Sequence, residues 1–263
     1  MNNMKKNPTE LWKEILKLQA YEHHCHSASD LKKTNKLGWA WRRILRVTQI
    51  IPPAKLFELG SGGGRNLVAL ALKGFPIHGI DVSPNVVERA KHFIQEVKEF
   101  QAIKATIEVA DILEYETQET YDMCFHVGVV EHFLEDGIRQ SIWKKLYDFT
   151  KPGGWIVSIV PCGMHIMRNM IRTRGLAGYQ IPEIDYSCGL HRKEFIKIGL
   201  SPVIIKPHNF FGFLNCHPNY LLSKFIAPML IIFGNLLLPQ FPIKEKIKEK
   251  LAHTILACGR RPE

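Results

Sequence analysis

A run of glycines directly after a short apolar stretch is the feature that most constrains how this chain can fold. Segment 55–59 predicts a β-strand, and Gly60-Ser61-Gly62-Gly63-Gly64 follows it at once. Glycine lets backbone N–H groups approach a ligand closely, and the first turn of a helix presents more of them. A glycine-rich strand-to-helix turn is therefore typical of α/β domains that bind nucleotide-like ligands. The same turn can also be purely structural, so neighbouring residues are needed to distinguish a ligand-binding loop from a structural one.

Strands and helices alternate along most of the chain after residue 50. Such alternation implies an α/β fold with a doubly wound, Rossmann-like, mostly parallel sheet and helices on both faces. Ser83 is expected to cap one helix and Pro84 to occupy its first position. The strands are predicted at 55–59, 76–80, 105–110, 121–127, 155–160, 203–207 and 253–258, and the intervening helices at 65–73, 84–100, 137–150 and 191–199.

The remaining segments suggest additions to this domain. Amphipathic patterns at 9–24 and 38–50 predict an N-terminal helical cap over 1–50, before a main domain over 51–263. Within that domain, 162–189 is irregular and is expected to form a lid-like insert. Residues 208–252 are expected to form an apolar and basic helical insert between the last two strands, where a short hairpin turn would be usual.

Composition bounds the setting of the protein. The six cysteines form no C-x-x-C pair, and the first residues are polar, which suggests a reducing, cytoplasmic location. The net charge of +10 is uneven, because basic residues concentrate before residue 56 and after residue 161. This asymmetry is compatible with simple solubility or with binding of an acidic partner. The run His23-His24-Cys25-His26 has no obvious distant ligands, so it predicts no metal site.

Two aspartates strengthen the case for a nucleotide-like ligand. Asp81 closes the second strand, 21 residues after Gly60, where a carboxylate can accept hydrogen bonds from ribose hydroxyls. Asp111 closes the third strand. Carboxyl ends of strands are where open α/β sheets bind ligands. The dinucleotide fingerprint needs a third glycine at position 65, but Arg65 stands there, which disfavours a nicotinamide-dependent oxidoreductase.

Several motifs in order resemble the class I S-adenosylmethionine-dependent methyltransferases. LFELGSGGGRN resembles the first motif of that family, GIDVSPNVVERAK the second, VADILEY the third and YDMCFHVGVVEHF the fourth. KPGGWIVSIVP and LHRKEFIKIGLSPVIIKP resemble the fifth and sixth strand regions. The resemblance covers about residues 50–207 and implies a seven-stranded sheet whose last strand is antiparallel.

The resemblance implies a cofactor, S-adenosyl-L-methionine, which leaves as S-adenosyl-L-homocysteine, and a role for each matching residue. Gly60, Ser61, Gly62 and Gly64 would shape the loop around the methionine part, and Glu58 would hold its amino group. Asp81 and Val82 would contact the ribose and adenine, Asp111 and Ile112 the adenine, and His126 and Val127 the opposite side of the pocket.

The sequence indicates the methyl acceptor less specifically than it indicates the cofactor. The VVEHF stretch most resembles small-molecule O-methyltransferases, some of which hold a divalent metal through E-x-x-E-H. Gly128 replaces the first glutamate here, so no metal is expected. His132, His191 and Tyr186 are the candidate general bases. The strand-four signature of nucleic-acid base methyltransferases is absent, so nucleic acid is a disfavoured partner.

The apolar stretch 225–238 raises the question of membrane contact. It has 14 residues, which is short for a span, and alternating lysines follow it. Core packing, a cover over a substrate cavity, and peripheral membrane contact through 220–250 are all compatible with this pattern. The leading interpretation is methyl transfer to an oxygen atom of a small molecule, and membrane contact would favour an amphiphilic or lipid-linked acceptor. The alternatives are a nucleic-acid or protein methyltransferase that uses its basic flanks, and a non-catalytic cofactor-binding regulator.

Overall fold

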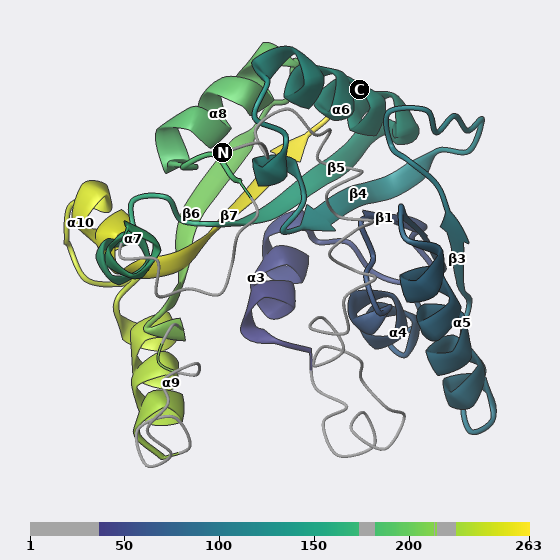
Figure 1. Ribbon diagram of the computed structural model, residues 1–263, viewed down its shortest axis with the longest axis horizontal. Coiled ribbons are helices and arrows are strands. Elements are labelled where there is room, and N and C mark those ends of the chain that lie inside the picture. The colour runs from purple at the N-terminus through teal and green to yellow at the C-terminus, as the bar shows by residue number, and fades with distance from the viewer. Residues whose placement is uncertain (1–36, 174–181, 213, 215–224) are drawn as a thin grey trace.

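The computed structural model describes residues 37–173, 182–212, 214 and 225–263 (Figure 1). Seven strands form one sheet in the order β3-β2-β1-β4-β5-β7-β6. Strand order reverses between β1 and β4, which makes this the switch point where open α/β sheets bind ligands. The strands are β1 Leu56–Leu59, β2 Ile77–Asp81, β3 Ala105–Val109, β4 Tyr121–Val127, β5 Thr150–Pro161, β6 Val203–Phe210 and β7 Ala252–Arg260.

The directions of the strands confirm the predicted topology. Strands β1 to β5 pair in parallel, from β3 at one edge across to β5. Strand β7 runs antiparallel to both of its neighbours, with Trp155 opposite Arg260 and Val203 opposite Gly259. The sheet is therefore seven-stranded and mostly parallel, and its last strand in the chain is antiparallel.

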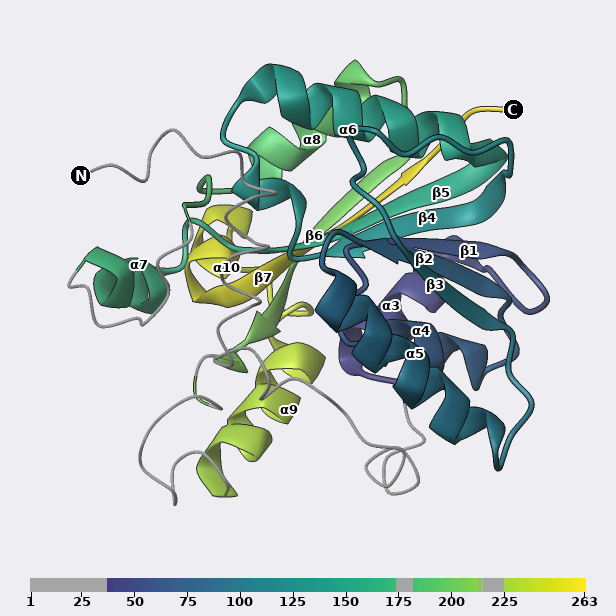
Figure 2. The same ribbon diagram turned by 45° about the vertical axis from the view of Figure 1, so that its right-hand side comes forward.

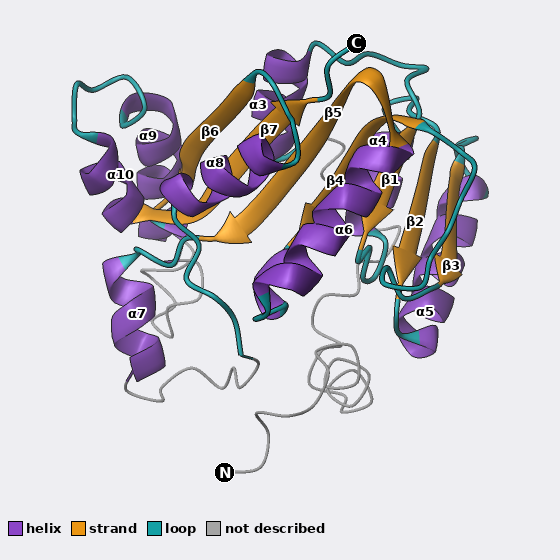
Figure 3. Ribbon diagram, turned by 90° about the horizontal axis from the view of Figure 1, so that it is seen from above, coloured by secondary structure: helices purple, strands orange, loops and turns teal. Residues whose placement is uncertain are grey.

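Helices cover both faces of the sheet (Figures 1 and 3). Helices α6 and α8 lie on one face and α3, α4 and α5 on the other. Helices α7, α9 and α10 gather near the β6 and β7 end. The helices are α3 Trp39–Thr48, α4 Arg65–Ala71, α5 Pro84–Lys98, η3 Val130–His132, α6 Asp136–Phe149, α7 Ile166–Thr173, α8 Cys188–Lys197, α9 Ala227–Leu237 and α10 Glu245–Leu251.

Apolar periodicity explains these layers. In β4, alternate side chains enter opposite cores: Met123 and Phe125 face the α3/α4/α5 side, and Cys124 faces the α6/α8 side. Helix α5 buries positions three and four residues apart, including Val86, Ala90 and Val97. Full burial of a valine, leucine, isoleucine, phenylalanine or methionine side chain stabilises the fold by about 1.5–3 kcal/mol.

The amino-terminal region is described only in part. Helix α3 places Trp41 and Ile44 in the same core as α4 and α5, so residues 37–50 pack as part of the main domain. The expected helix over 9–24 lies outside the described residues, and so does most of the predicted cap.

Three local expectations change. Ser83 precedes α5, but its side chain makes no capping hydrogen bond; Asp81 Oδ1 accepts from the Ser83 backbone N–H instead. Strand β5 begins at Thr150, before the predicted start at Trp155, and its register with β4 shifts between these two residues, where Gly153 has a left-handed φ of 75°. The stretch expected to be irregular contains α7, although 174–181 lies outside the described residues.

Candidate functional site

The glycine loop lies at the carboxyl end of β1. Gly60, Gly62 and Gly64 all have left-handed φ angles, at 67°, 52° and 78°. A Cβ on Gly60 would lie 2.5 Å from Val129 Cγ2, whereas one on Gly62 would meet no atom within 4 Å. Gly60 is therefore required by close packing and by its φ. Gly62 combines a left-handed φ with open space beside its backbone, where a ligand can approach.

Asp81 fastens this loop to the end of β2. Its Oδ2 accepts a hydrogen bond from Gly62 N at 2.9 Å, and its Oδ1 accepts one from Ser83 N at 3.0 Å. Burial raises the pKa of Asp81, while the two backbone donors favour its charged form. A carboxylate has about four acceptor sites, so Asp81 can hold the loop and still accept from a ligand hydroxyl.

Ser61 has a structural contact within the same loop. Its hydroxyl donates to the backbone carbonyl of Glu58 at 3.2 Å, and its side chain fills the space beside Gly79. This packing keeps β1 close to β2, its neighbour on the side away from β4. The contribution of Ser61 to the site is the shape of the loop.

Glu58 is a buried carboxyl group with an unused oxygen. Its Oε1 accepts from Asn66 Nδ2 at 2.7 Å, and Asn66 in turn accepts from Trp41 Nε1 at 3.1 Å. No described residue donates to Oε2 of Glu58, which is buried. Burial raises the pKa of Glu58 to about 8. A buried acidic oxygen of this kind lacks a donor, and a cationic amino group of a ligand would supply one.

The third strand supplies a polar turn. Asp111 Oδ1 accepts from Leu113 N at 3.0 Å, which holds the turn after β3. Ile112 is buried in the α6/α8 core, and Val82 is half-buried beside Asp81. Asp111 and Val82 thus follow neighbouring strands at the same edge of the sheet as the glycine loop.

His126 lies elsewhere than the sequence suggested. Its ring is fully buried and packs against Trp143 of α6, with 5.4 Å between ring centroids. Desolvation holds the pKa of His126 well below its usual range. Side chains alternate along β4, so His126 points into the α6/α8 core, whereas Val127 ends the strand and is 37% exposed. We therefore assign His126 to the core and keep Val127 as the β4 residue of the site.

Tyr186 and His191, two of the candidate bases, are fully buried, and Tyr186 belongs to a hydrogen-bond network around Glu194. Glu194 accepts hydrogen bonds from Tyr186 Oη at 2.7 Å, Trp143 Nε1 at 2.9 Å and Arg139 Nε at 3.1 Å. Burial raises the pKa of Tyr186 and lowers that of His191 to about 3. Both side chains are fully buried, so packing between α6 and α8 accounts for them without a catalytic role.

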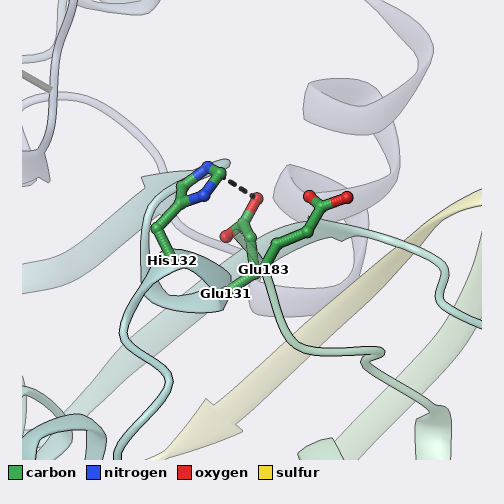
Figure 4. A group of neighbouring side chains, drawn as sticks. All are labelled: Glu131, His132 and Glu183. Atoms are coloured by element: carbon green, nitrogen blue, oxygen red, sulfur yellow. Dashed lines mark ion pairs between the residues drawn. The ribbon is translucent and has the colours of Figure 1, made fainter. Parts of the chain in front are cut away.

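His132, the third candidate base, does lie at the carboxyl edge. It belongs to η3, next to Glu131, and Figure 4 shows Glu183 reaching the same place from the stretch after α7. The ring nitrogen Nε2 of His132 is 4.0 Å from Glu131 Oε1. Burial raises the pKa of Glu131 to about 8 and lowers that of His132 to about 4. Sequence reasoning missed Glu183, because nothing in its surroundings marks it apart from the expected lid.

A separate cavity lies at the amino-terminal ends of the strands, at the far end of the sheet from the glycine loop. Its volume is about 630 Å³, and residues at the amino ends of the strands line it, including Lys55, Ile77, Ala105 and Tyr121. Open α/β sheets bind ligands beyond the carboxyl ends of their strands. The glycine loop, and not this cavity, therefore marks the candidate site.

Comparison with known proteins agrees with this geometry. The sequence model of the family "Tellurite resistance protein TehB" matches residues 23–171, more than half of the chain. Hemagglutinin 1 of Eikenella corrodens is 29% identical over 150 residues, which is 54% of this chain and 48% of that protein. "Probable S-adenosyl-L-methionine-dependent methyltransferase TehB" of Haemophilus influenzae (strain 10810) is 30% identical over 126 residues, 45% of this chain and 42% of that protein. The aligned parts thus span about half the length of the curated relatives.

A solved structure shows the same fold. Phosphoethanolamine N-methyltransferase 2 of Haemonchus contortus, in complex with S-adenosyl-L-methionine, superposes with a TM-score of 0.56. It is 18% identical, and the superposition covers 85% of this chain and 52% of that one. The fold is therefore that of class I methyltransferases, and the chain belongs to the tellurite resistance protein TehB family of S-adenosylmethionine-dependent methyltransferases.

Proposed function

We propose that this protein binds S-adenosyl-L-methionine at the carboxyl edge of β1, β2 and β3 and transfers its methyl group to a small molecule. The observation that carries the proposal is the buried, unused Oε2 of Glu58 below an open glycine loop. The methionine ammonium of the cofactor would supply the missing donor. The residues present therefore fit the ammonium group of the cofactor, which needs an acidic acceptor.

The other residues follow from their places around the loop. Gly62 leaves room for the methionine part, and Asp81 would accept hydrogen bonds from the ribose hydroxyls. Val82 and Asp111 would contact the adenine, with Val127 on the opposite side. The cofactor supplies an electrophilic sulfonium methyl group. The contribution of the chain is orientation of this group and exclusion of water, because in-line attack depends on geometry.

The acceptor we propose is a hydroxyl group on an amphiphilic small molecule. Relatives of the same fold act on other acceptors, as the phosphoethanolamine N-methyltransferase shows by its name. Fold alone therefore does not fix the attacked atom. The motif after β4 supports oxygen as the attacked atom, and an apolar helix described below supports an amphiphilic acceptor.

Calorimetric titration tests the cofactor directly. We expect S-adenosyl-L-methionine and S-adenosyl-L-homocysteine each to bind once per chain, and NAD not to bind, because Arg65 stands where a dinucleotide loop needs glycine. Binding of NAD in preference to the sulfonium cofactor would contradict the proposal. Transfer of a labelled methyl group to candidate acceptors then follows with the same sample.

Helix α9 supports contact with a membrane surface. Only one narrow face packs on β6: a Cβ on Gly234 would lie 2.9 Å from Phe210 Cβ, and Asn235 Oδ1 accepts from Asn209 N at 3.0 Å. The other faces are apolar and open, with Met229 73% exposed and Phe233 50% exposed. Figure 2 shows α9 standing away from the helices that cover the sheet. It is therefore not a core helix.

Positive charge accompanies this apolar surface. Lys244, Lys246 and Lys250 are exposed on or beside α10, the next helix along the chain. An apolar helix beside lysines suits the interface of an anionic bilayer. Within the described residues, no helix combines the length and apolar character that crossing a bilayer requires. We therefore propose peripheral binding through α9 and α10.

Vesicle flotation tests this surface. We expect the protein to float with phosphatidylcholine vesicles that contain phosphatidylglycerol, and Met229→Glu/Phe233→Glu to lower its partition coefficient at least about tenfold, since two apolar side chains would leave the membrane. The matched control is Ile196→Glu, which alters an equally exposed apolar residue of α8. Failure of the wild-type protein to float with these vesicles would contradict membrane binding.

A further inference from the structure

We propose that Glu131, His132 and Glu183 form a binding site for a divalent metal ion. One potential ligand atom from each residue lies within 4.8 Å of the others. Two residues come from η3 and the third from a stretch some fifty residues later, so only folding brings the set together (Figure 4). The proposal concerns this cluster alone and does not depend on the proposed methyl transfer.

The orientation of His132 is the first argument. Its Nδ1 lies 3.2 Å from the backbone carbonyl oxygen of Pro182, and a carbonyl can only accept. Nδ1 must therefore carry the proton, so in the neutral ring Nε2 carries the lone pair. Metal-binding histidines are held in the same way, through a hydrogen bond from the second ring nitrogen to a carbonyl or carboxylate.

The space between His132 and Glu131 is the second argument. The lone-pair nitrogen Nε2 is 4.0 Å from Glu131 Oε1, which is too long for a hydrogen bond. Two lone pairs that face each other across this gap repel, so either a proton on Glu131 or a metal ion has to lie between them. A metal ion with bonds of about 2.1 Å places its ligands about 3.4 Å apart in tetrahedral geometry, so the set closes on an ion by a small contraction.

The burial of Glu131 is the third argument. Its carboxyl group is 2% exposed, and no described residue donates a hydrogen bond to its Oε2. Glu183 is paired with the guanidinium of Arg168, which compensates one of the two carboxylates. The charge of Arg168 also acts on Glu131, but the ion pairs of the described residues give Glu131 no lysine or arginine of its own. Ionising a buried carboxyl group costs free energy, and a bound cation would offset that cost.

The ligand types limit the choice of ion. One imidazole nitrogen and two carboxylates suit Zn²⁺ or Mn²⁺ better than Ca²⁺, which prefers an all-oxygen shell. The site adjoins the glycine loop, because Val129, just before η3, packs against Gly60. The ion would therefore lie at the edge of the sheet where we place the cofactor, and His132 would be a ligand and not a general base.

Mn²⁺ is the better probe, because it disfavours thiolates and so avoids Cys25 in the histidine-rich run near the amino terminus. The full chain, stripped with a chelator and dialysed, would be titrated with Mn²⁺ alone and followed by electron paramagnetic resonance. We expect one tight site per chain. Glu131→Gln and Glu183→Gln should each weaken it at least about tenfold, because each removes one charged ligand.

The matched control is Glu135→Gln, which alters an exposed glutamate near the cluster and should leave Mn²⁺ affinity unchanged. Circular dichroism checks that each variant is folded, and Glu183→Asp, which keeps the charge, should retain part of the affinity. The wild-type protein failing to bind Mn²⁺, or both glutamine variants binding it as the wild type does, would overturn the site. If the wild-type protein does not bind Mn²⁺, a proton on Glu131, and not a metal ion, separates Glu131 from His132. Titration of the same sample with S-adenosyl-L-methionine keeps this outcome distinct from failure of the proposed function.

Discussion

Asp81→Asn is expected to weaken S-adenosyl-L-methionine binding about 100-fold, or about 2.7 kcal/mol. The two oxygens of Asp81 accept from two backbone N–H groups, those of Gly62 and Ser83. An asparagine has one oxygen and one NH₂ group, so one of these N–H groups would face another donor. The loop would lose its attachment to β2 and the ribose would lose a charged acceptor, each worth about 1.5–3 kcal/mol when intact.

Calorimetric titration measures this effect, with Asp148→Asn as the control. Asp148 is an aspartate of α6 that is half exposed and pairs with Lys144, so its replacement should change the cofactor affinity less than twofold, within about 0.4 kcal/mol. Wild-type affinity in a folded Asp81→Asn protein would show that the carboxylate does not hold the cofactor.

Glu194→Ala is expected to lower the free energy of unfolding by about 3–5 kcal/mol. The change leaves three buried donors without their acceptor, those of Arg139, Trp143 and Tyr186. The guanidinium of Arg139 is the most costly of them, because its side chain is 6% exposed. Small domains are stable by only about 5–15 kcal/mol, so the loss would be a large part of the total.

Urea denaturation followed by tryptophan fluorescence measures this loss. Asp136→Ala is the control, because Asp136 pairs with the same guanidinium at 2.9 Å but is 64% exposed. Its removal should cost less than about 1 kcal/mol, since solvent screens an exposed pair. If both variants lost the same free energy, the buried network would not hold α6 and α8 together as described.

Local signals explain how much of the fold the sequence predicts. Strands β1 to β4 and helices α4 to α6 lie within a few residues of their predicted bounds, because short buried strands and amphipathic helices have distinct periodicities. The glycine run, Asp81 and Asp111 could be placed at one edge because parallel strands all end there. The sequence therefore predicts both the sheet and the cofactor edge of the candidate site.

Side-chain direction was harder to predict. His126 and Val127 are neighbours in β4, and the motif alone placed both in the pocket, but alternation turns His126 toward Trp143. Tyr186 and His191 were candidates because their residue types suit proton transfer. The structure buries both side chains: Tyr186 donates to Glu194, and His191 packs against Trp143 and Tyr186.

What the sequence by itself determined is the order of strands and helices along the chain and the loop where we propose that the cofactor binds, because both follow from short-range pattern and glycine chemistry. Only the tertiary structure decided which titratable groups meet. Glu183 joins Glu131 and His132 from a distant segment, and α9 exposes apolar faces that a sequence cannot distinguish from a core helix. Both results depend on contacts between segments far apart in the chain, which local propensity does not encode.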